Sequence, residues 1–404
     1  MSQPGLALTI QPTALVSLLE SAHTPHQLAA YRGVLTPQRL DAPADETAAL
    51  VSGAAIHDLG WMRRVAVRGQ DRFRWLSGMV TNTVNDLFPN TGAWNFVLNA
   101  QGRIQGDLTV WRKGEELSPV RRHPDPESPG SADRLSGTPF AGASELELEI
   151  AADQYEKLLA HLNHFIIMDD VELIPVGCEP GCEGGAETAI GLTGPLAGEL
   201  LERVGLPAIA QPMEGTSIEW NGWELRILRG YGALAAHYEF FLPSAGLARL
   251  WSCLRAAGAV PTGSASLEAF RIAEGIPVYG TDISDRDLPQ ETSQMRALHF
   301  AKGCYLGQEI VERIRSRGNV HRHLRPVEVF GPAPAPGTEL TLEDGAAAGL
   351  ISSAAELALQ PAQRVFALAM MRAEAEAKAQ EFHYSSGAAA GTARILAAPP
   401  VVAA

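Results

Sequence analysis

Cysteine is scarce in this chain, and its scarcity limits the chemistry that the sequence can support. Four cysteines occur among 404 residues, too few for a scaffold held together by disulfides. Cys178 and Cys182 lie in a stretch rich in Gly and Glu that has no second pair of ligands, so we predict no metal site. Cys253 falls within a helical pattern and is expected to pack against its neighbours. Cys304 remains as the candidate for a working thiol.

Positive charge and long apolar runs are also in short supply. Lys and Arg number 32 against 46 Asp and Glu, which gives a formal net charge of −14. A broad surface for nucleic acid or for an anionic membrane needs the opposite sign, so we predict neither as a direct partner. No window approaches the roughly 18 apolar residues of a membrane span, and residues 1–30 lack the pattern of a secretory signal. We therefore expect a cytoplasmic protein.

Motifs for nucleotide phosphates and for a hydrolase serine are missing as well. What the chain does have is enough apolar sequence for a large core, with 46% hydrophobic and 19% charged residues, and a length that suits two or three domains. Two stretches share a rhythm of strand, helix, hairpin and helix. The first has a strand at 64–68, a helix at 71–79 and a hairpin over 94–111, and the second has a hairpin around Asn221-Gly222.

These patterns predict an α+β protein in four parts. After Pro326, short apolar runs alternate with turn signals, which is typical of a small β-rich domain. The predicted parts are a leader with a short helix and a polar linker at 1–53, a first α+β unit at 54–155 with an exposed insertion at about 113–143, a second α+β unit at 156–325, and the β-rich domain at 326–404.

The most informative stretch surrounds Cys304, in the run Lys302-Gly303-Cys304-Tyr305-Leu306-Gly307-Gln308-Glu309. The glycines suit a tight loop, and the residues after Gly307 suit a helix. A thiol just before a helix lies near unpaired backbone N–H groups, and Lys302 adds positive charge. We therefore predict a lowered thiol pKa and a reactive sulfur. The alternative is that Cys304 is a buried packing residue, the usual fate of a free cysteine.

Arginine is concentrated just downstream of this run. Five arginines and no acid occur between Arg313 and Arg325, in a chain that is acidic as a whole. Guanidinium groups suit carboxylates and phosphates, so one hypothesis is an anionic ligand near Cys304. The alternative is a solvated segment whose arginines point to water.

Several motifs together resemble the YgfZ-type proteins, which are relatives of the glycine-cleavage T-protein. The octet Lys302–Glu309 is the most specific of these motifs, and the resemblance covers roughly residues 54–325 apart from the insertion. The other matching motifs are Asp58-Leu59, Gly69-Gln70-Asp71, Thr81-Asn82, Leu98-Asn99-Ala100-Gln101-Gly102-Arg103-Ile104, Gly275-Ile276-Pro277-Val278-Tyr279-Gly280, Leu288-Pro289-Gln290-Glu291 and Arg317-Gly318.

The resemblance implies two ferredoxin-like α+β units and a C-terminal β-barrel around a central channel that holds tetrahydrofolate. It also implies an accessory role in the assembly or repair of iron–sulfur proteins, tRNA-modifying enzymes among them. One cysteine cannot hold a cluster that takes about four ligands, so a transient cluster would be shared with a client protein or another partner. On this resemblance we predict Cys304 and Lys302 as catalytic residues. The predicted cofactor-binding residues are Asp107, Tyr305, Gln308, Glu309 and Arg317.

Two departures from the T-protein pattern bear on activity. Where the T-protein has adjacent aspartates, this chain has Gly106-Asp107, and we expect the missing first carboxylate to undermine aminomethyl transfer. The loop at 230–235 supplies no acid where the T-protein has a glutamate that contacts the pterin, which weakens the case for folate. The leading hypothesis is therefore an accessory factor and not a conventional enzyme. The alternatives are a tetrahydrofolate-dependent aminomethyltransferase or related one-carbon transferase that uses Asp107, and a folate-binding scaffold without chemistry.

Overall fold

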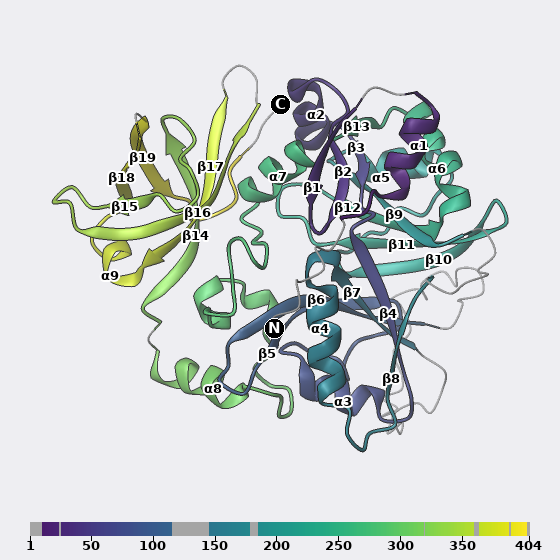
Figure 1. Ribbon diagram of the computed structural model, residues 1–404, viewed down its shortest axis with the longest axis horizontal. Coiled ribbons are helices and arrows are strands. Elements are labelled where there is room, and N and C mark those ends of the chain that lie inside the picture. The colour runs from purple at the N-terminus through teal and green to yellow at the C-terminus, as the bar shows by residue number, and fades with distance from the viewer. Residues whose placement is uncertain are drawn as a thin grey trace, which may run out of the picture.

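The computed structural model describes residues 10–23, 26–114, 145–177, 185–318, 320–358, 363–387 and 389–401. Two α+β halves and a β-barrel lie side by side in this part of the chain (Figure 1). Cys178, Cys182 and almost all of the predicted insertion fall outside the described residues. Within the described ranges, no helix is long and apolar enough to cross a membrane.

One mixed sheet runs through both halves. A single residue pair, Glu214 with Thr91, joins the edge strand of one half to the edge strand of the other. Within the described residues the sheet has eleven strands. In spatial order these are β13 (Val260–Thr262), β3 (Ala55–Asp58), β9 (Glu187–Thr193), β12 (His237–Pro243), β11 (Trp223–Gly230), β10 (Glu214–Trp220), β5 (Thr91–Leu98), β6 (Ile104–Lys113), β7 (Glu145–Ala151), β4 (Met62–Arg68) and β8 (Glu172–Pro175).

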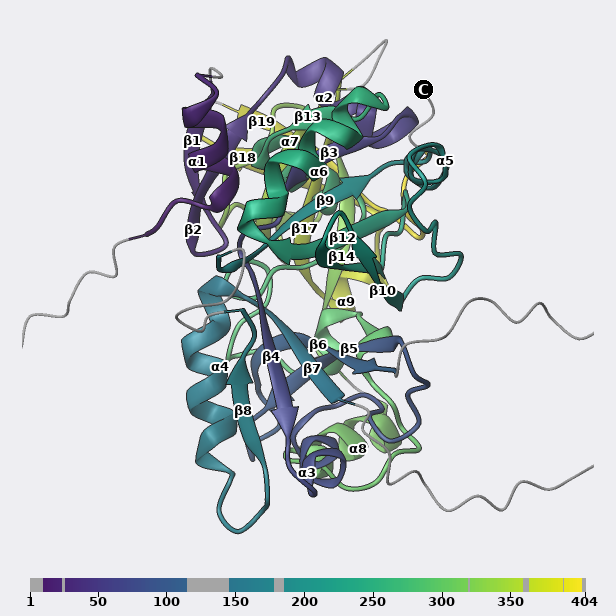
Figure 2. The same ribbon diagram turned by 90° about the vertical axis from the view of Figure 1, so that its right-hand side faces the viewer.

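Helices pack apolar side chains on the outer faces of this sheet, with α4 in one half and α6 in the other, whereas α7 packs against the barrel and the strand Val34–Arg39. Leu158 and Leu162 of α4 lie one turn apart and pack on Leu108 and Val110 of β6. Figure 2 shows α4 along one side of the half that contains β4 and β7. The helices of the two halves are α1 (Ala14–Ser21), α2 (Pro43–Ser52), α3 (Arg72–Met79), α4 (Ala152–His164), α5 (Ala197–Arg203), α6 (Ser244–Ala256) and α7 (Ser264–Ala273).

Side-chain alternation along β6 decides which residues face the interior between the halves. Leu108 and Val110 point to the helix layer, so Asp107, Thr109 and Trp111 point to the opposite, inner face. The same rule places the glutamates of β7 on the inner face. The polar faces of two strands therefore meet inside the protein and not in solvent.

The leader is more ordered than the sequence analysis predicts. The short helix is confirmed as α1, but the polar linker is wrong: a hairpin of β1 (Gln27–Tyr31) and β2 (Val34–Arg39) is followed by α2. Glu46 of α2 explains the difference. Its fully buried carboxylate accepts hydrogen bonds from the backbone N–H groups of Leu40 and Gly263 and from the hydroxyl of Ser266. A polar sequence is thus fixed by buried tertiary hydrogen bonds.

The C-terminal part is a closed barrel, as predicted, and the α+β fold class is confirmed. Ser352 and Ser353 of the barrel each donate a hydrogen bond of 2.6 Å to Oδ1 of Asp282, which fastens the barrel to the second half. Between the halves and the barrel lie two 3-10 turns, Pro289–Thr292 and Met295–Ala297, and the helix α8 (Gln308–Arg317). The barrel consists of β14 (Arg322–Phe330), β17 (Arg364–Arg372), β16 (Ala347–Leu357), β15 (Glu339–Thr341), β18 (Glu381–Ser386) and β19 (Ala389–Ile395), with the short helix α9 (Ala373–Glu376) after β17.

Candidate functional site

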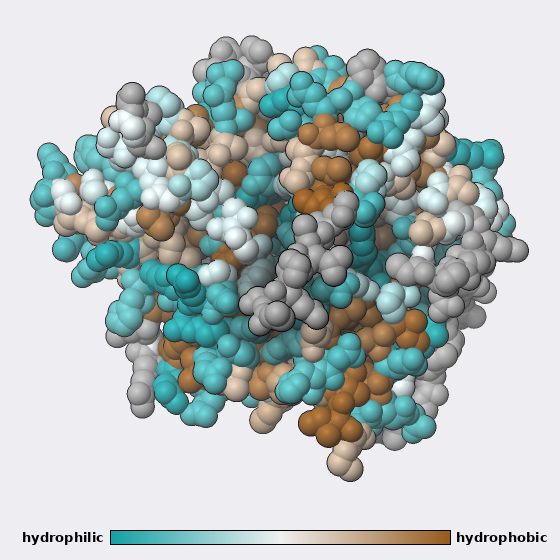
Figure 3. Space-filling model, in the orientation of Figure 1, coloured by the Kyte–Doolittle hydropathy of each residue, from teal (hydrophilic) through white to brown (hydrophobic). Residues whose placement is uncertain are grey.

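A cavity of about 270 Å³ lies where the inner faces of the two halves meet. We call it the central cavity. A second cavity, of about 370 Å³, lies against the barrel and shares Tyr231, Glu274, Ile276 and Arg296 with the first. Figure 3 shows that this face of the molecule is hollowed between the barrel and the α+β halves. The two adjoining cavities occupy the place of the predicted channel.

Asp107 of β6 lies in the wall of the central cavity and is held firmly there. One carboxylate oxygen accepts a hydrogen bond of 2.9 Å from Nε1 of Trp94 on β5. The other accepts one of 3.0 Å from Nε2 of Gln154 on α4, whose Oε1 in turn accepts from the backbone N–H of Asp107. A carboxylate fixed at two points and facing a cavity can hold or move a proton in a defined geometry.

The neighbouring position, Gly106, faces the other way. A Cβ atom built on it would lie 2.7 Å from Oε1 of Gln154 and 2.8 Å from Cδ2 of Leu158, in the layer between β6 and α4. An aspartate at 106 would therefore point into the helix packing and not into the cavity. The expectation that its absence undermines transfer is not supported by this geometry, because the carboxylate that reaches the cavity is the one the chain retains.

Glu274 brings a second carboxylate to the cavity. It follows the last turn of α7, and its Oε1 accepts a hydrogen bond of 2.9 Å from the backbone N–H of Leu234. Burial raises its pKa to about 6, although backbone N–H groups of Ala233 and Ala235 oppose the rise. The loop at 230–235 contains no acid, but the carboxylate of Glu274, at the end of α7, lies against it. Sequence reasoning missed this residue because the two segments lie forty positions apart.

Arg296 supplies a cation between the two cavities. Its guanidinium carbon lies 3.7 Å from the ring centre of Tyr231 and 4.4 Å from that of Trp94, so the planar group is held between two aromatic side chains. Burial lowers its pKa to about 10. The arginine therefore remains charged at neutral pH, with flat apolar surfaces on both sides.

The wall opposite Asp107 is a chain of buried titratable groups. His57 Nε2 lies 2.9 Å from the hydroxyl of Thr193, which lies 2.7 Å from Nδ1 of His237, whose Nε2 lies 3.2 Å from Oε1 of Glu239. Burial raises the pKa of Glu239 to about 7. It raises that of Glu149 as well, and repulsion from Glu239 adds to this second rise. Burial lowers the pKa of His57 to about 3. At neutral pH this wall is therefore less charged than its composition suggests.

The loop around Cys304 lies elsewhere. Cys304 is exposed, so the alternative that it is a buried packing residue is wrong. The ammonium of Lys302 donates hydrogen bonds to the carbonyl oxygens of Val80 and Asn82, at 2.6 and 2.7 Å. Burial lowers the pKa of this lysine to about 7. Lys302 thus ties the loop to the first half, and its activation of the thiol stays a prediction.

The other predicted residues of this loop also lie apart from the residues that line the central cavity in the described chain. Tyr305 is buried under the Lys302 ammonium, and burial raises its pKa to about 12. Gln308 begins α8, and Glu309 is exposed and pairs with Arg313 at 2.7 Å. The backbone of Arg317 ends α8, and its side chain lies outside the described part. Of the predicted cofactor-binding residues whose side chains the structure describes, Asp107 alone lines the cavity.

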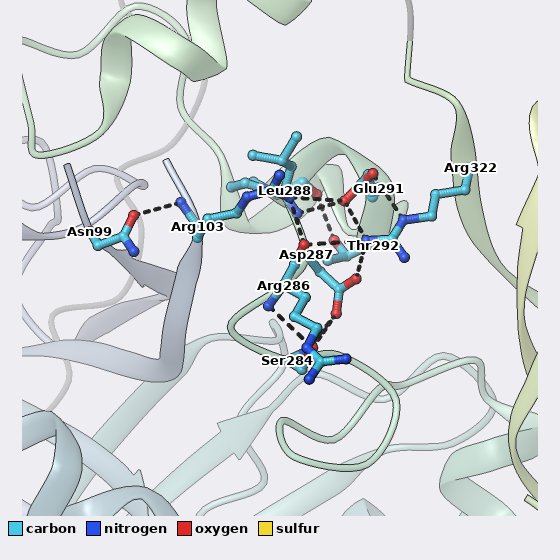
Figure 4. A network of polar contacts seen from close by, with 10 residues as sticks. Asn99, Arg103, Ser284, Arg286, Asp287, Leu288, Glu291, Thr292 and Arg322 are labelled. Atoms are coloured by element: carbon cyan, nitrogen blue, oxygen red, sulfur yellow. Dashed lines mark hydrogen bonds and ion pairs between the residues drawn. The ribbon is translucent and has the colours of Figure 1, made fainter. Parts of the chain in front are cut away.

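Acidic partners neutralise the described arginines downstream of Cys304. Arg315 pairs with Glu312, and Arg325 pairs with Glu376 at 2.9 Å. Arg322 reaches Asp287 at 2.8 Å and Glu291 at 3.0 Å (Figure 4). The run itself contains no acid, because its partners lie outside it: Glu309 and Glu312 precede it on α8, and Asp287, Glu291 and Glu376 come from other segments. These contacts do not support the hypothesis of an anionic ligand held by the run.

The motif Leu288-Pro289-Gln290-Glu291 has a structural role in the same network. Glu291 accepts a hydrogen bond of 2.8 Å from the backbone N–H of Leu288 while it holds Arg322 of β14. Arg103, in the turn after β5, also reaches this glutamate, at 3.9 Å (Figure 4). The network joins the first half, the 3-10 turn and the barrel.

Comparison with known proteins agrees with this architecture. Residues 23–119 match the family model described as the GCVT N-terminal domain. A chloroplastic protein of Arabidopsis thaliana that bears the name "putative transferase" is 21% identical over 75% of this chain, which spans 62% of that protein's length. An aminomethyltransferase of Geobacillus kaustophilus is 24% identical over 78% of this chain and 79% of its own, and one of Nostoc sp. is 23% identical over 87% and 86%.

The fold of a solved relative matches almost the whole chain. The glycine cleavage system aminomethyltransferase T from Bartonella henselae superposes with a TM-score of 0.78 at 16% sequence identity, over 97% of this chain and 98% of that one. The two halves and the barrel thus form one known architecture, and the chain has a GcvT-like fold. In sequence it is similar to the GCVT N-terminal domain and to aminomethyltransferases.

Proposed function

We propose that this GcvT-like chain is a tetrahydrofolate-dependent aminomethyltransferase or a related one-carbon transferase. The observation that carries the proposal is the carboxylate of Asp107, fixed by Trp94 and Gln154 in a cavity that Glu274 and Arg296 also line. Relatives that bear the name aminomethyltransferase support it. Two departures from the T-protein pattern favoured an accessory factor: the glycine at 106 and the absence of an acid in the loop at 230–235. Neither argues against transfer in the folded protein, because Gly106 faces away from the cavity and Glu274 supplies the missing acid.

The residues around the cavity fit a reduced folate. The carboxylate of Glu274 is a suitable acceptor for the N–H groups at the edge of a pterin ring. The rings of Trp94 and Tyr231, which hold Arg296 between them, add apolar surface to the same part of the cavity. The guanidinium of Arg296 is the kind of cation that the carboxylates of a glutamyl tail need.

Asp107 is the residue that would handle the proton. Bound tetrahydrofolate would supply the nitrogen that accepts the one-carbon unit. Asp107 would orient the donor amine and hold the proton that its nitrogen gains or loses, since its oxygens are already fixed by two neutral donors. The aromatic side chains of Trp61 and Trp111, which also line the cavity, would exclude water from the reacting atoms.

Turnover measurements test the proposal directly. We expect purified protein to convert tetrahydrofolate to its methylene form, with release of ammonia, when an aminomethyl donor is supplied, and Asp107→Asn to abolish this while folate still binds. Calorimetric titration with tetrahydrofolate reports the binding step separately. Binding without product from any donor would identify a folate scaffold and overturn the proposed transfer. Absence of binding would remove the cofactor as well.

The exposed thiol of Cys304 keeps a second candidate open, the iron–sulfur accessory role of the YgfZ-type proteins. An accessible sulfur can engage a cluster or a sulfur species that a client shares. The test is complementation: Cys304→Ser is returned to cells that lack the protein, and the activity of a cluster-dependent enzyme is measured. We expect lost activity under this second role. Full rescue would leave the transferase as the sole candidate.

A further inference from the structure

The segment Val80–Asn82, which follows α3, is held by a second segment from a distant part of the chain. All three of its carbonyl oxygens accept hydrogen bonds from the segment 296–302. The ammonium of Lys302 donates two of these bonds, at 2.6 and 2.7 Å, and the backbone N–H of His299 donates the third, at 3.1 Å. The first two residues of the held segment are fully buried, so a lost donor there is costly to replace.

The side chains of the same segment reach back and hold the residue that precedes this contact, Arg296. Nδ2 of Asn82 donates hydrogen bonds to the carbonyl oxygens of Arg296 and Trp94, at 2.8 and 3.0 Å. The hydroxyl of Thr81 donates one of 2.7 Å to the carbonyl oxygen of Ala297. One amide group thus joins the backbones of two residues whose side chains stack, since the guanidinium carbon of Arg296 lies 4.4 Å from the ring centre of Trp94.

The guanidinium of Arg296 is placed where a ligand can meet it. It lines both the central cavity and the second cavity, and its Nε donates a hydrogen bond of 3.2 Å to Oε1 of Gln294. In the part of the chain that the structure describes, no carboxylate forms an ion pair with it. Its two terminal nitrogens form a fork that matches a carboxylate. A cation that is held in place beforehand binds an anion more tightly than a mobile one, because less conformational entropy is lost on binding.

We infer that Lys302 and Asn82 are positioning residues for Arg296, and that they thereby set the affinity of the two cavities for an anionic ligand. The inference rests on the proposed function, in which that anion is the glutamyl end of a reduced folate. Lys302 fixes the backbone of Asn82, and the amide of Asn82 fixes the backbone of Arg296. The lysine of the Cys304 loop therefore acts on the site without contacting the ligand, and the thiol takes no part in this action.

Calorimetric titration of the full chain with two probes tests the inference. Tetrahydrofolate carries the glutamyl tail, whereas 6-methyltetrahydropterin has the reduced ring without it. We expect Lys302→Met and Asn82→Ala each to weaken tetrahydrofolate by about tenfold, the loss typical of one hydrogen bond to a charged group, and to leave the affinity for the pterin unchanged. In turnover, Lys302→Met should raise KM for tetrahydrofolate more than it lowers kcat, because the lost contact is made in the ground state as well.

A combined variant shows whether the lysine acts through the arginine. Arg296→Met should weaken tetrahydrofolate at least as much as Lys302→Met, and the two substitutions together should cost no more than Arg296→Met alone. Lys378→Met is the matched control, because Lys378 is exposed in the barrel and should leave the binding of both probes as in the parent. If Lys302→Met does not fold, Asn82→Ala tests the same contact from its other side.

Crystal structures of Lys302→Met and Asn82→Ala decide the positioning without any ligand. We expect the guanidinium of Arg296 to leave the ring of Trp94 in both. Three results would overturn the inference: tetrahydrofolate affinity unchanged in both variants, equal losses for tetrahydrofolate and the pterin, or Arg296 stacked in both variants as in the parent. A parent protein that binds no tetrahydrofolate would remove the cofactor from the proposed function, and the crystal structures would still decide what Lys302 and Asn82 do.

Discussion

The Cys304 loop and the central cavity are two regions that differ in how their residues are gathered. The loop is one contiguous run of eight residues that is easy to recognise in the sequence. The cavity is assembled from strands and helices of both halves, and its key side chains, Asp107, Glu274 and Arg296, come from distant segments. The Cys304 loop provides an exposed thiol and a lysine that ties the loop to the first half. The residues of the central cavity provide an enclosed space with charged groups held in place.

The difference teaches that a distinctive motif need not contain the groups that meet the substrate. Lys302 and Tyr305 in the loop have structural contacts that account for them: an ammonium on two carbonyl oxygens and a buried ring beneath it. In the cavity, by contrast, burial raises the pKa values of Glu274 and Glu239 and lowers that of Arg296, and these three side chains line one enclosed space. Perturbed groups that line one cavity are typical of functional sites.

The largest expected effect separates the two regions by activity. Asp107→Asn keeps the shape of the side chain but removes its ability to take a proton, so one-carbon transfer should fall by about 10²–10⁴-fold. Cys304→Ser should leave the transfer rate unchanged, since the thiol is exposed and lies away from the cavity. Steady-state rates of methylene-tetrahydrofolate formation measure both. Equal losses in the two variants would reverse the comparison and return the chemistry to the loop.

Restoring the T-protein's aspartate pair tests the geometry of β6. Gly106→Asp should destabilise the fold by on the order of 3 kcal/mol, because its Cβ meets Gln154 and Leu158 and its charge enters an apolar layer. It should not raise the transfer rate. Thermal unfolding and turnover of the variant check both outcomes, with Gly303→Asp as a control for aspartate itself, because Gly303 is exposed and a Cβ built on it meets nothing within 4 Å. A faster, equally stable Gly106→Asp protein would contradict the assignment of the two faces.

A third prediction uses the pH dependence of stability to probe the cavity wall. Burial raises the pKa of Glu239 in the folded protein from the ordinary glutamate value of 4.5 to about 7. The folded chain therefore holds a proton that the unfolded chain releases between pH 4.5 and 7, and stability falls as pH rises through that window. Glu239→Gln should remove on the order of 2 kcal/mol of this fall.

Melting temperatures measured from pH 4.5 to 8 report this slope. Glu219→Gln is the matched control, because Glu219 lies exposed on β10 and should leave the slope as it is. Burial also raises the pKa of Glu187 to about 7 and that of Glu274 to about 6. These two carboxyls should therefore preserve part of the fall of stability with pH in the Glu239 variant. An unchanged slope in Glu239→Gln would show that its carboxyl is ionised in the folded protein.

Much of the fold follows from local pattern. Alternation predicts β4 and β7, the i, i+3, i+4 spacing predicts α4, and Asn221-Gly222 predicts the turn between β10 and β11. Alternation alone does not show which face of a strand is exposed to solvent. The glutamates at 147 and 149 look like an outer face, yet both are buried because β7 faces the second half. Pairing of this kind depends on tertiary placement, which one sequence does not reveal.

The candidate site was predictable to a smaller degree, and for a related reason. Asp107 could be found because the resemblance to the T-protein points to the pair Gly106-Asp107, whereas Glu274 and Arg296 become site residues only when the loop at 230–235 folds against them. The run of arginines misled for the opposite reason, since Asp287, Glu291 and Glu376 lie far from it in sequence.

The smallest expected effect concerns that run of arginines. Arg313 lies on the exposed side of α8 and pairs with Glu309 one turn earlier, so Arg313→Ala should cost about 0.3–0.5 kcal/mol. Arg322→Ala should cost more, about 1–3 kcal/mol, because it strips hydrogen bonds from Asp287 and Glu291, which are buried. Chemical denaturation measures both. If the run instead bound an anionic ligand, Arg313→Ala would weaken the binding of folate or phosphate while stability stayed constant. We expect both variants to bind these ligands with the affinity of the parent protein, because the protein's own carboxylates already pair with these arginines.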